Sequence, residues 1–255
     1  RQPGARKGGR KTGAKAGGWQ GPGGDGNDGM DAHGVLISVI IPVLDDAAAL
    51  AQLLRHLRPD PRIEIVVVDG GGDAHLAELA RARLDLRLVR SSPGRATQMN
   101  AGAKVANGQW LLFLHADSML PDGWLDLFER SVADAQGGWF AFALDHPSRH
   151  ARLIECGVRW RVRLFGLAYG DQGLFVTSNL FEAMGGYRDI PLMEDVDFVR
   201  RLRRRARVVQ VPVTIRTSAR RWERDGWWAR SARNLTLVTL YFAGVSPARL
   251  AKWYR

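Results

Sequence analysis

Residues 35–46 read VLISVIIPVLDD, and residues 63–72 read IEIVVVDGGG. Each run of β-branched residues has the length of a strand buried on both faces, and each ends in aspartate or glycine, which favour turns. Between the two runs, leucines at positions 50, 53, 54 and 57 have the spacing of an amphipathic helix. A strand, a helix and a second strand in this order predict a parallel sheet.

The same alternation continues along the first half of the chain. We expect helices over residues 75–83 and 95–106 and strands over residues 86–89 and 110–114. The second half is less regular, with strands expected at 139–144, 173–177 and 208–215, a helix at 194–205, and two helices between 227 and 254. The sequence therefore predicts an α/β fold with a mostly parallel, Rossmann-like sheet and helices on both faces, in which ligands bind at the carboxyl edge of the strands.

Composition divides the chain into three parts. Residues 1–34 form a tail rich in Gly, Arg and Lys, which has too little apolar surface to fold and is expected to be disordered. Residues 35–225 form the main domain, and residues 226–255 form a helical extension packed on that domain or on a membrane surface. The net charge of +11 leaves nucleic acid or anionic lipid open as a partner. Residues 1–29 contribute +4 of it, with six basic and two acidic side chains.

The cysteine content and the hydropathy indicate the cellular compartment. Cys156 is the single cysteine, which excludes an internal disulfide and a multi-cysteine zinc site. No run approaches the roughly 18 to 20 apolar residues of a membrane-spanning helix. We therefore expect a cytoplasmic protein, and peripheral contact with the inner face of the membrane stays open.

Three aspartates, Asp45, Asp69 and Asp117, follow predicted strands or begin predicted helices. A parallel sheet would gather such positions along one edge, where a ligand could meet all three. Taken one at a time, each aspartate is explained as well by the simpler role of a helix N-cap.

From about residue 37 to about residue 225 the chain resembles a family 2 glycosyltransferase with the GT-A fold, the fold of nucleotide-diphospho-sugar transferases. Ile40–Asp46 is similar to the family's Pro-Val-x-Asn-Glu turn, with Asp-Asp in place of Asn-Glu. Val66–Gly71 resembles its Val-Asp-Asp-Gly-Ser signature, and Gly94–Gly102 resembles the segment before its metal motif. The resemblance implies nucleotide-sugar contacts by Pro42, Asp45, Asp69, Arg95, Asn100 and Asp117.

The run Leu114–Ser118 stands where the family has its Asp-x-Asp metal motif. The resemblance implies that Asp117 binds a divalent metal, Mg²⁺ or Mn²⁺, whereas His115 replaces the first aspartate. One carboxylate suffices for Mg²⁺, which also binds substrate phosphates and water, and an imidazole ligand would suit Mn²⁺ better. Whether His115 binds the metal or forms a local hydrogen bond stays open.

The run Met193–Asp197 resembles the family's acidic motif at a helix start, in which an aspartate deprotonates the acceptor. The resemblance implies that Asp195 is the general base, with Glu194 beside it. The simpler interpretation is a helix N-terminus made acidic to suit the helix dipole. The acceptor side is assigned to Asp171, Arg221 and Trp222, and a plain turn explains Asp171 equally well.

Together these motifs imply an inverting enzyme that moves one sugar from a nucleoside-diphosphate sugar to a hydroxyl on a small-molecule or lipid-linked acceptor, with no nucleic-acid partner. The short chain and its His-Ala-Asp motif are most similar to a small soluble bacterial subgroup associated with arsenosugar biosynthesis. The alternative is a basic α/β protein that binds nucleic acid or anionic lipid without catalysis, which the net charge favours. A dinucleotide dehydrogenase is disfavoured because no Gly-x-Gly-x-x-Gly opens a helix.

Overall fold

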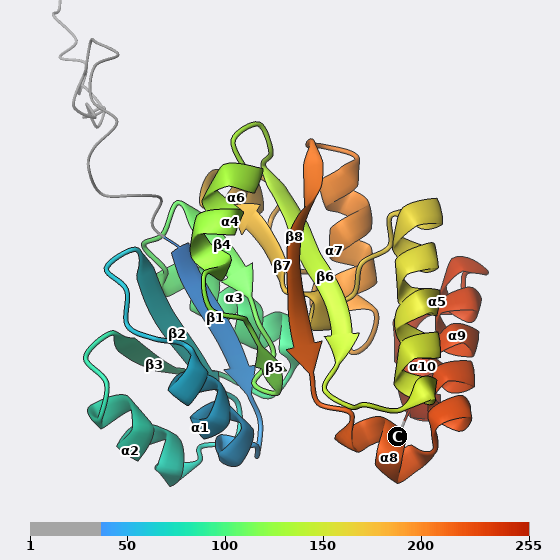
Figure 1. The fold of residues 1–255 in the computed structure, drawn as a ribbon, viewed down its shortest axis with the longest axis horizontal. Coiled ribbons are helices and arrows are strands. Elements are labelled where there is room, and N and C mark those ends of the chain that lie inside the picture. The colour runs from blue at the N-terminus through green and yellow to red at the C-terminus, as the bar shows by residue number, and fades with distance from the viewer. Residues whose placement is uncertain (1–36, 255) are drawn as a thin grey trace, which may run out of the picture. The chain divides into compact units, whose positions relative to one another are not determined.

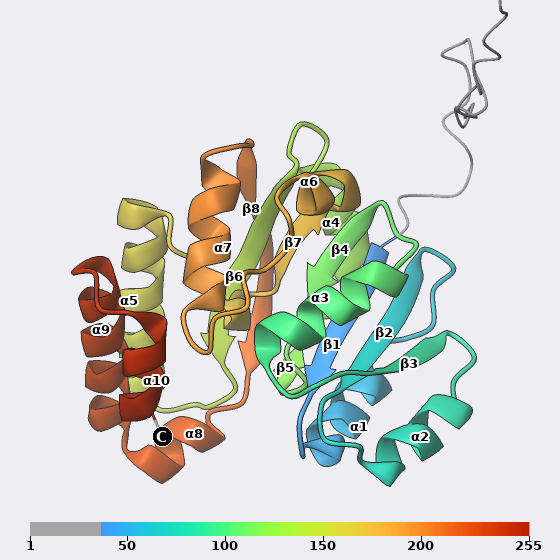
Figure 2. The same cartoon turned by 180° about the vertical axis from the view of Figure 1, so that it is seen from behind.

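The computed structural model describes residues 37–254. These residues build a mixed eight-stranded sheet in the order β3-β2-β1-β4-β7-β6-β8-β5. Helices cover both faces of the sheet (Figure 1 and Figure 2). The tail expected at residues 1–34 and the expected strand start at residue 35 lie outside the described residues.

The first half of the chain follows the predicted alternation of strands and helices. Three helices connect the first four strands: α1 (Ala47–His56), α2 (Ala74–Arg81) and α3 (Arg95–Val105). The four strands are parallel and adjacent: β1 (Ile37–Val43), β2 (Ile63–Asp69), β3 (Leu86–Arg90) and β4 (Trp110–Phe113). Their carboxyl ends therefore meet at one edge of the sheet, as the sequence predicts.

Successive residues of β1 supply two separate cores, because strand side chains alternate between the faces of a sheet. Val39 and Ile41 belong to the cluster that packs α1, α2 and α4 (Trp124–Ser131). Ile40 belongs to the cluster on the other face, which packs α3, α6 (Ser178–Ala183) and α7 (Glu194–Arg203). On this second face Gly102 lets α3 lie close to the sheet, since a Cβ there would be 2.5 Å from Ile40 Cγ2.

The second half adds strands of both directions. β7 (Leu174–Thr177) is antiparallel to β4 and to β6 (Gly137–Leu144), and β8 (Val208–Thr217) is parallel to β6. Among the described residues, the two-residue β5 (Ser118–Met119) pairs only with the end of β8. Pro212 lies where β8 has β6 as its single neighbour within residues 37–254 and the pairing register shifts, a position that tolerates the missing N–H of proline.

The remaining elements surround one end of this sheet. They are α5 (Arg149–Phe165), the 3₁₀ turn η1 (Gly170–Gln172), α8 (Arg220–Asp225), α9 (Trp227–Phe242) and α10 (Pro247–Tyr254). The last two helices pack together through a small cluster that contains Leu192, Leu237 and Leu250. Of the helices in residues 37–254, none has the length and apolar content needed to cross a bilayer.

Candidate active site

A cavity of about 120 Å³ brings together segments that lie far apart in the sequence. Its walls come from the start of α3, the residues after β4, the turn before β7, the start of α7, the end of β8, and helices α8 to α10. Seven of the residues that the sequence assigned to the site line this cavity: Arg95, Asp117, Asp171, Glu194, Asp195, Arg221 and Trp222.

The start of α7 fixes the two acidic residues assigned to catalysis. Met193, directly before them, has the left-handed backbone angle φ of 66°, which a residue other than glycine rarely adopts. Asp195 Oδ2 accepts a hydrogen bond of 2.8 Å from the backbone N–H of Gly170, and Oδ1 accepts one of 2.7 Å from the N–H of Val196. These contacts hold the Asp195 carboxylate against the turn that precedes β7.

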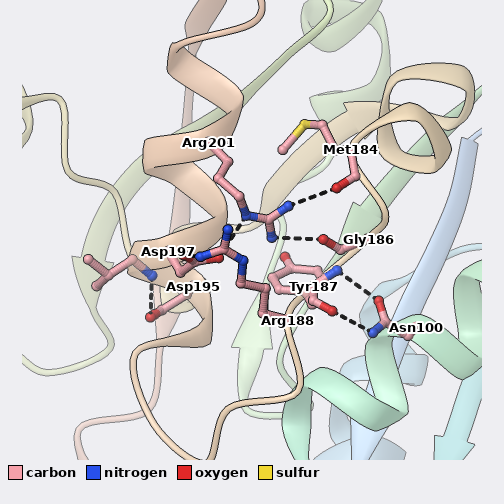
Figure 3. Close-up of polar contacts among 9 residues, drawn as sticks. Asn100, Met184, Gly186, Tyr187, Arg188, Asp195, Asp197 and Arg201 are labelled. Atoms are coloured by element: carbon pink, nitrogen blue, oxygen red, sulfur yellow. Dashed lines mark hydrogen bonds and ion pairs between the residues drawn. The ribbon is translucent and has the colours of Figure 1, made fainter. Parts of the chain in front are cut away.

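An ion-pair network around the nearly buried Asp197 carboxylate holds the loop that leads into α7 (Figure 3). Asp197 Oδ2 accepts from Arg201 Nε at 2.7 Å, and Oδ1 accepts from Arg188 Nη1 at 3.0 Å. The Arg201 guanidinium also donates to the carbonyl oxygens of Met184 and Gly186. Because Asp197 lies two residues after Asp195, this network positions the candidate base without entering the cavity.

Asn100, for which a nucleotide contact is expected, holds the same loop from the other side. Asn100 Nδ2 donates to the Tyr187 carbonyl at 2.8 Å, and the Tyr187 N–H donates to Asn100 Oδ1 at 2.9 Å (Figure 3). Both polar ends of the side chain are thus bonded to the backbone of Tyr187, and Asn100 is not among the residues that line the cavity. Asn100 therefore fixes the loop, and its contact with the nucleotide stays a prediction.

Burial shifts the titration of three side chains at the cavity. It raises the pKa of Glu194 to about 7, with repulsion from Asp195 as the second cause. It also raises the pKa of Asp171 to about 6, and Asp171 Oδ1 is buried with no hydrogen-bond partner among the described residues. For His115 burial lowers the pKa to about 3, and the nearby Arg95 and Arg221 lower it further. The His115 imidazole is therefore neutral at physiological pH.

His115 packs tightly against the turn that holds Asp195. A Cβ added at Gly170 would lie 2.9 Å from His115 Nε2 and 3.6 Å from Asp195 Oδ2. Only a residue without a side chain fits here, so Gly170 sets how closely the imidazole and the carboxylate approach each other.

Two of the predicted nucleotide contacts lie together outside this cavity, at the ends of β1 and β2. Asp69 is 2% exposed; its Oδ1 accepts hydrogen bonds from the N–H groups of Gly71 and Gly72, and its Oδ2 is buried with no partner within residues 37–254. Asp45 has a left-handed φ of 53°, and its Oδ1 is 2.8 Å from where a Cβ of Gly71 would be. Pro42 lies inside β1, paired with Val68.

An ion pair joins the end of β1 to the helices that wall the cavity. Arg220 at the start of α8 donates to Asp46 Oδ2 at 2.7 Å. Asp46 is the N-cap residue of α1, but its side chain makes no capping hydrogen bond. Its carboxylate pairs with α8 instead.

Several residues that line the cavity were not among the predicted site residues. They are Tyr169 and Thr217, and Arg230, Asn234 and Tyr254 from the last two helices. Arg230 is 5% exposed; it donates to Asp225 Oδ2 at 2.6 Å and to the Tyr254 hydroxyl at 3.3 Å. The position of these residues depends on how α9 and α10 pack, which no local motif encodes.

Sequence comparison finds relatives among glycosyltransferases. The model of glycosyl transferase family 2 matches residues 38–150. The uncharacterized protein MT1568 of Mycobacterium tuberculosis is 30% identical over 207 residues, which are 69% of this chain and 65% of that protein. A PGL/p-HBAD biosynthesis glycosyltransferase of Mycobacterium bovis is 36% identical over 93 residues, which are 33% of this chain and 36% of that protein. The chain thus spans 65% and 36% of the lengths of these relatives.

Comparison with solved structures tests the fold class. Staphylococcus aureus TarS 1–349 in complex with UDP matches with a TM-score of 0.56 and 16% identity, over 72% of this chain and 60% of that one. The mannosyltransferase PcManGT from Pyrobaculum calidifontis, in complex with GDP-Man and Mn²⁺, matches with a TM-score of 0.58 and 19% identity, over 85% and 67%. The predicted GT-A fold is confirmed. Residues 38–150 thus match the model of glycosyl transferase family 2, and the described residues share the GT-A fold of these two solved structures.

Proposed function

We propose that this chain is a glycosyltransferase that moves one sugar from a nucleoside-diphosphate sugar to a hydroxyl acceptor. The observation that carries the proposal is the cavity where Asp117, Asp171 and Asp195 meet Arg95 and Arg221. The cations suit a diphosphate, and the carboxylates suit a metal ion and the proton of an acceptor hydroxyl. The UDP of the TarS complex and the GDP-Man and Mn²⁺ of the PcManGT complex support the same donor class.

The donor base is proposed to lie against Asp69. A buried carboxylate oxygen without a partner costs free energy, so Asp69 Oδ2 is suited to accept an N–H group from a nucleotide base. Asp45 lies beside it across Gly71, and the strained backbone of Asp45 is of the kind that collects at binding sites. The diphosphate would then extend toward Arg95 at the start of α3.

The metal ion is proposed to bind Asp117. Residues 37–254 contain no group of three or more His, Cys, Asp or Glu side chains placed to hold an ion. The single carboxylate of Asp117 fits an Mg²⁺ or Mn²⁺ ion whose other ligands include oxygens of the donor diphosphate. When bound, such an ion neutralises the charge that develops on the leaving diphosphate. The neutral imidazole of His115 is compatible with a role as ligand or as packing partner.

Asp195 is proposed as the general base. The Gly170 N–H fixes its carboxylate at the cavity wall, where it can take the proton of an acceptor hydroxyl. Asp171 is the rival base, because its raised pKa and its unpartnered Oδ1 also suit proton transfer. With a base and no protein nucleophile, transfer proceeds with inversion at the anomeric carbon. The resemblance to the bacterial subgroup associated with arsenosugar biosynthesis stays a prediction.

The test is thermal stabilisation of the full chain by UDP-, GDP- and TDP-sugars, with and without Mn²⁺, since a ligand of the folded state raises the melting temperature. Asp117→Asn should abolish the metal-dependent part of the shift. Asp195→Asn should keep the shift and slow turnover by about a hundredfold or more. The exposed Asp122→Asn is the matched control and should change neither.

Three results would overturn parts of the proposal. If no nucleotide sugar stabilises the chain, the donor assignment fails. If Asp195→Asn turns over at the normal rate while Asp171→Asn does not, Asp171 is the base. If NMR of the product shows a retained anomer, single displacement is wrong.

A further inference from the structure

A second cavity among the described residues, of about 1190 Å³, opens between α5 and α9. We call it the α5–α9 groove. The two helices lie side by side at one end of the sheet (Figure 2). Their N-terminal ends touch where His150 stacks on Trp227, with ring centroids 5.8 Å apart. Beyond that contact the groove separates them, with the basic end of α7 as a third wall.

The walls of this groove are large apolar side chains that face water. Seven of the eleven exposed large apolar residues in the described chain line it: Leu153, Trp160, Leu164, Phe165, Trp228, Leu235 and Phe242. The exposed fraction is 63% for Leu164 on α5 and 67% for Leu235 on α9. A contiguous apolar surface of this kind marks a binding site, because leaving it in water is costly.

The groove is continuous with the candidate active site. Tyr169, Asp171, Trp222, Asn234 and Val238 line both cavities. A ligand that fills the groove therefore ends beside the carboxylates proposed for catalysis. The groove is also larger than the roughly 300 to 1,000 Å³ of most small-molecule pockets, which indicates a long occupant.

Unpaired cations line the same groove. Arg161, Arg200, Arg203 and Arg204 all contact it, and no ion pair within residues 37–254 includes any of them. Arg161 lies at the junction of the two cavities, with its guanidinium carbon 3.3 Å from the centre of the Tyr169 ring. Its Nε and Nη2 donate to neutral oxygens, the Leu167 carbonyl and Gln172 Oε1. The charge of Arg161 acts on the nearby Asp171 carboxylate but forms no ion pair with it, so the guanidinium can also bind an anionic group.

We propose, resting on the function proposed above, that the acceptor is an anionic amphiphile. Its aliphatic chain lies in the α5–α9 groove, its anionic group lies beside Arg161, and its hydroxyl reaches Asp171 and Asp195. The apolar walls bind the aliphatic chain, Arg161 binds the anionic group, and the residues shared by both cavities lie beside the hydroxyl. These three binding features follow one another along one continuous space. No single feature of the sequence predicts this arrangement.

The test uses alkyl phosphates as probes, at concentrations below those at which they form micelles. Binding of butyl, octyl and dodecyl phosphate to the full chain is measured by calorimetry. Each methylene that enters the groove should tighten binding about fourfold. Leu164→Glu should weaken dodecyl phosphate about tenfold or more and leave butyl phosphate unchanged. Leu84→Glu, at a fully exposed leucine outside the groove, should change neither.

Several outcomes would overturn the proposal. If butyl and dodecyl phosphate bind with equal affinity, or if the two variants have equal effects, the alkyl chain of the ligand does not lie in the groove. Binding to anionic vesicles but not to monomeric alkyl phosphate would make the groove a membrane-docking face. Loss of a dimer in Leu164→Glu, seen by sedimentation, would make it a contact between copies. Donor binding is scored separately: chain-length-dependent binding without any nucleotide-sugar shift would leave the groove standing and refute the proposed function.

Discussion

Replacing Glu194 with glutamine should make the protein more stable at alkaline pH. Glu194 is 4% exposed, and burial raises its pKa from 4.5 to about 7. The folded state therefore holds a proton that the unfolded chain has already lost, so the free energy of unfolding falls as pH rises from 4.5 through 7. Over that interval the loss amounts to about 3 kcal/mol, at roughly 1.4 kcal/mol per pH unit. Glutamine carries no charge and removes this loss.

The assay is urea unfolding of the wild type and the variant between about pH 4 and about pH 8. Glu194→Gln should match the wild type at the acid end and exceed it by about 3 kcal/mol at the alkaline end. The attraction to Arg95, at 3.7 Å and with Arg95 41% exposed, offsets little of this gain. Glu182→Gln, at an exposed position of α6, is the control and should follow the wild type. A difference between Glu194→Gln and wild type that does not change with pH would refute the reasoning.

Two further substitutions test how the site is held. Asp197→Ala should lower the free energy of unfolding by about 3 to 5 kcal/mol, because it leaves the nearly buried Arg201 without its counter-charge; a loss below about 1 kcal/mol in urea would contradict this. Gly170→Ala should slow turnover about tenfold to a hundredfold by displacing His115, whereas the exposed control Asp122→Asn should leave kcat unchanged. A rate in Gly170→Ala equal to that of the control would show that the position of His115 is unimportant.

The strands and helices of the first half could be predicted because each has a strong period of its own. The expected strand at residues 63–68 is β2, Ile63–Asp69, and the expected helix at residues 95–106 is α3, Arg95–Val105. The direction of β7 could not be predicted, since an apolar run reads the same in a parallel and an antiparallel strand. Helix α5 escaped prediction for a different reason. Apolar residues alternate with Arg159, Arg161 and Arg163 in its second half, which is the period of a strand, and only three of its 17 residues are buried.

The candidate site divides in the same way. Asp117 and Asp195 could be proposed from the sequence because they lie in short motifs beside strand and helix ends. Arg230 and Tyr254 could not, because their place at the cavity depends on tertiary contacts among residues such as Leu192 and Leu250. The bonds of Asn100 to the Tyr187 backbone could not be predicted either, because Tyr187 lies 87 residues further along the chain.

Part of the wall of the active-site cavity comes from α9 and α10, two helices that take no part in the sheet. Insertions or substitutions in these two helices can reshape the cavity while every pairing of the sheet stays intact. Asp45 and Asp69, by contrast, follow directly from neighbouring strands, where a shift of one residue would disturb the pairing of β1 with β2. In proteins that descend from a common ancestor, the helices that wall the cavity and the strand ends near Asp45 and Asp69 are therefore free to diverge at different rates.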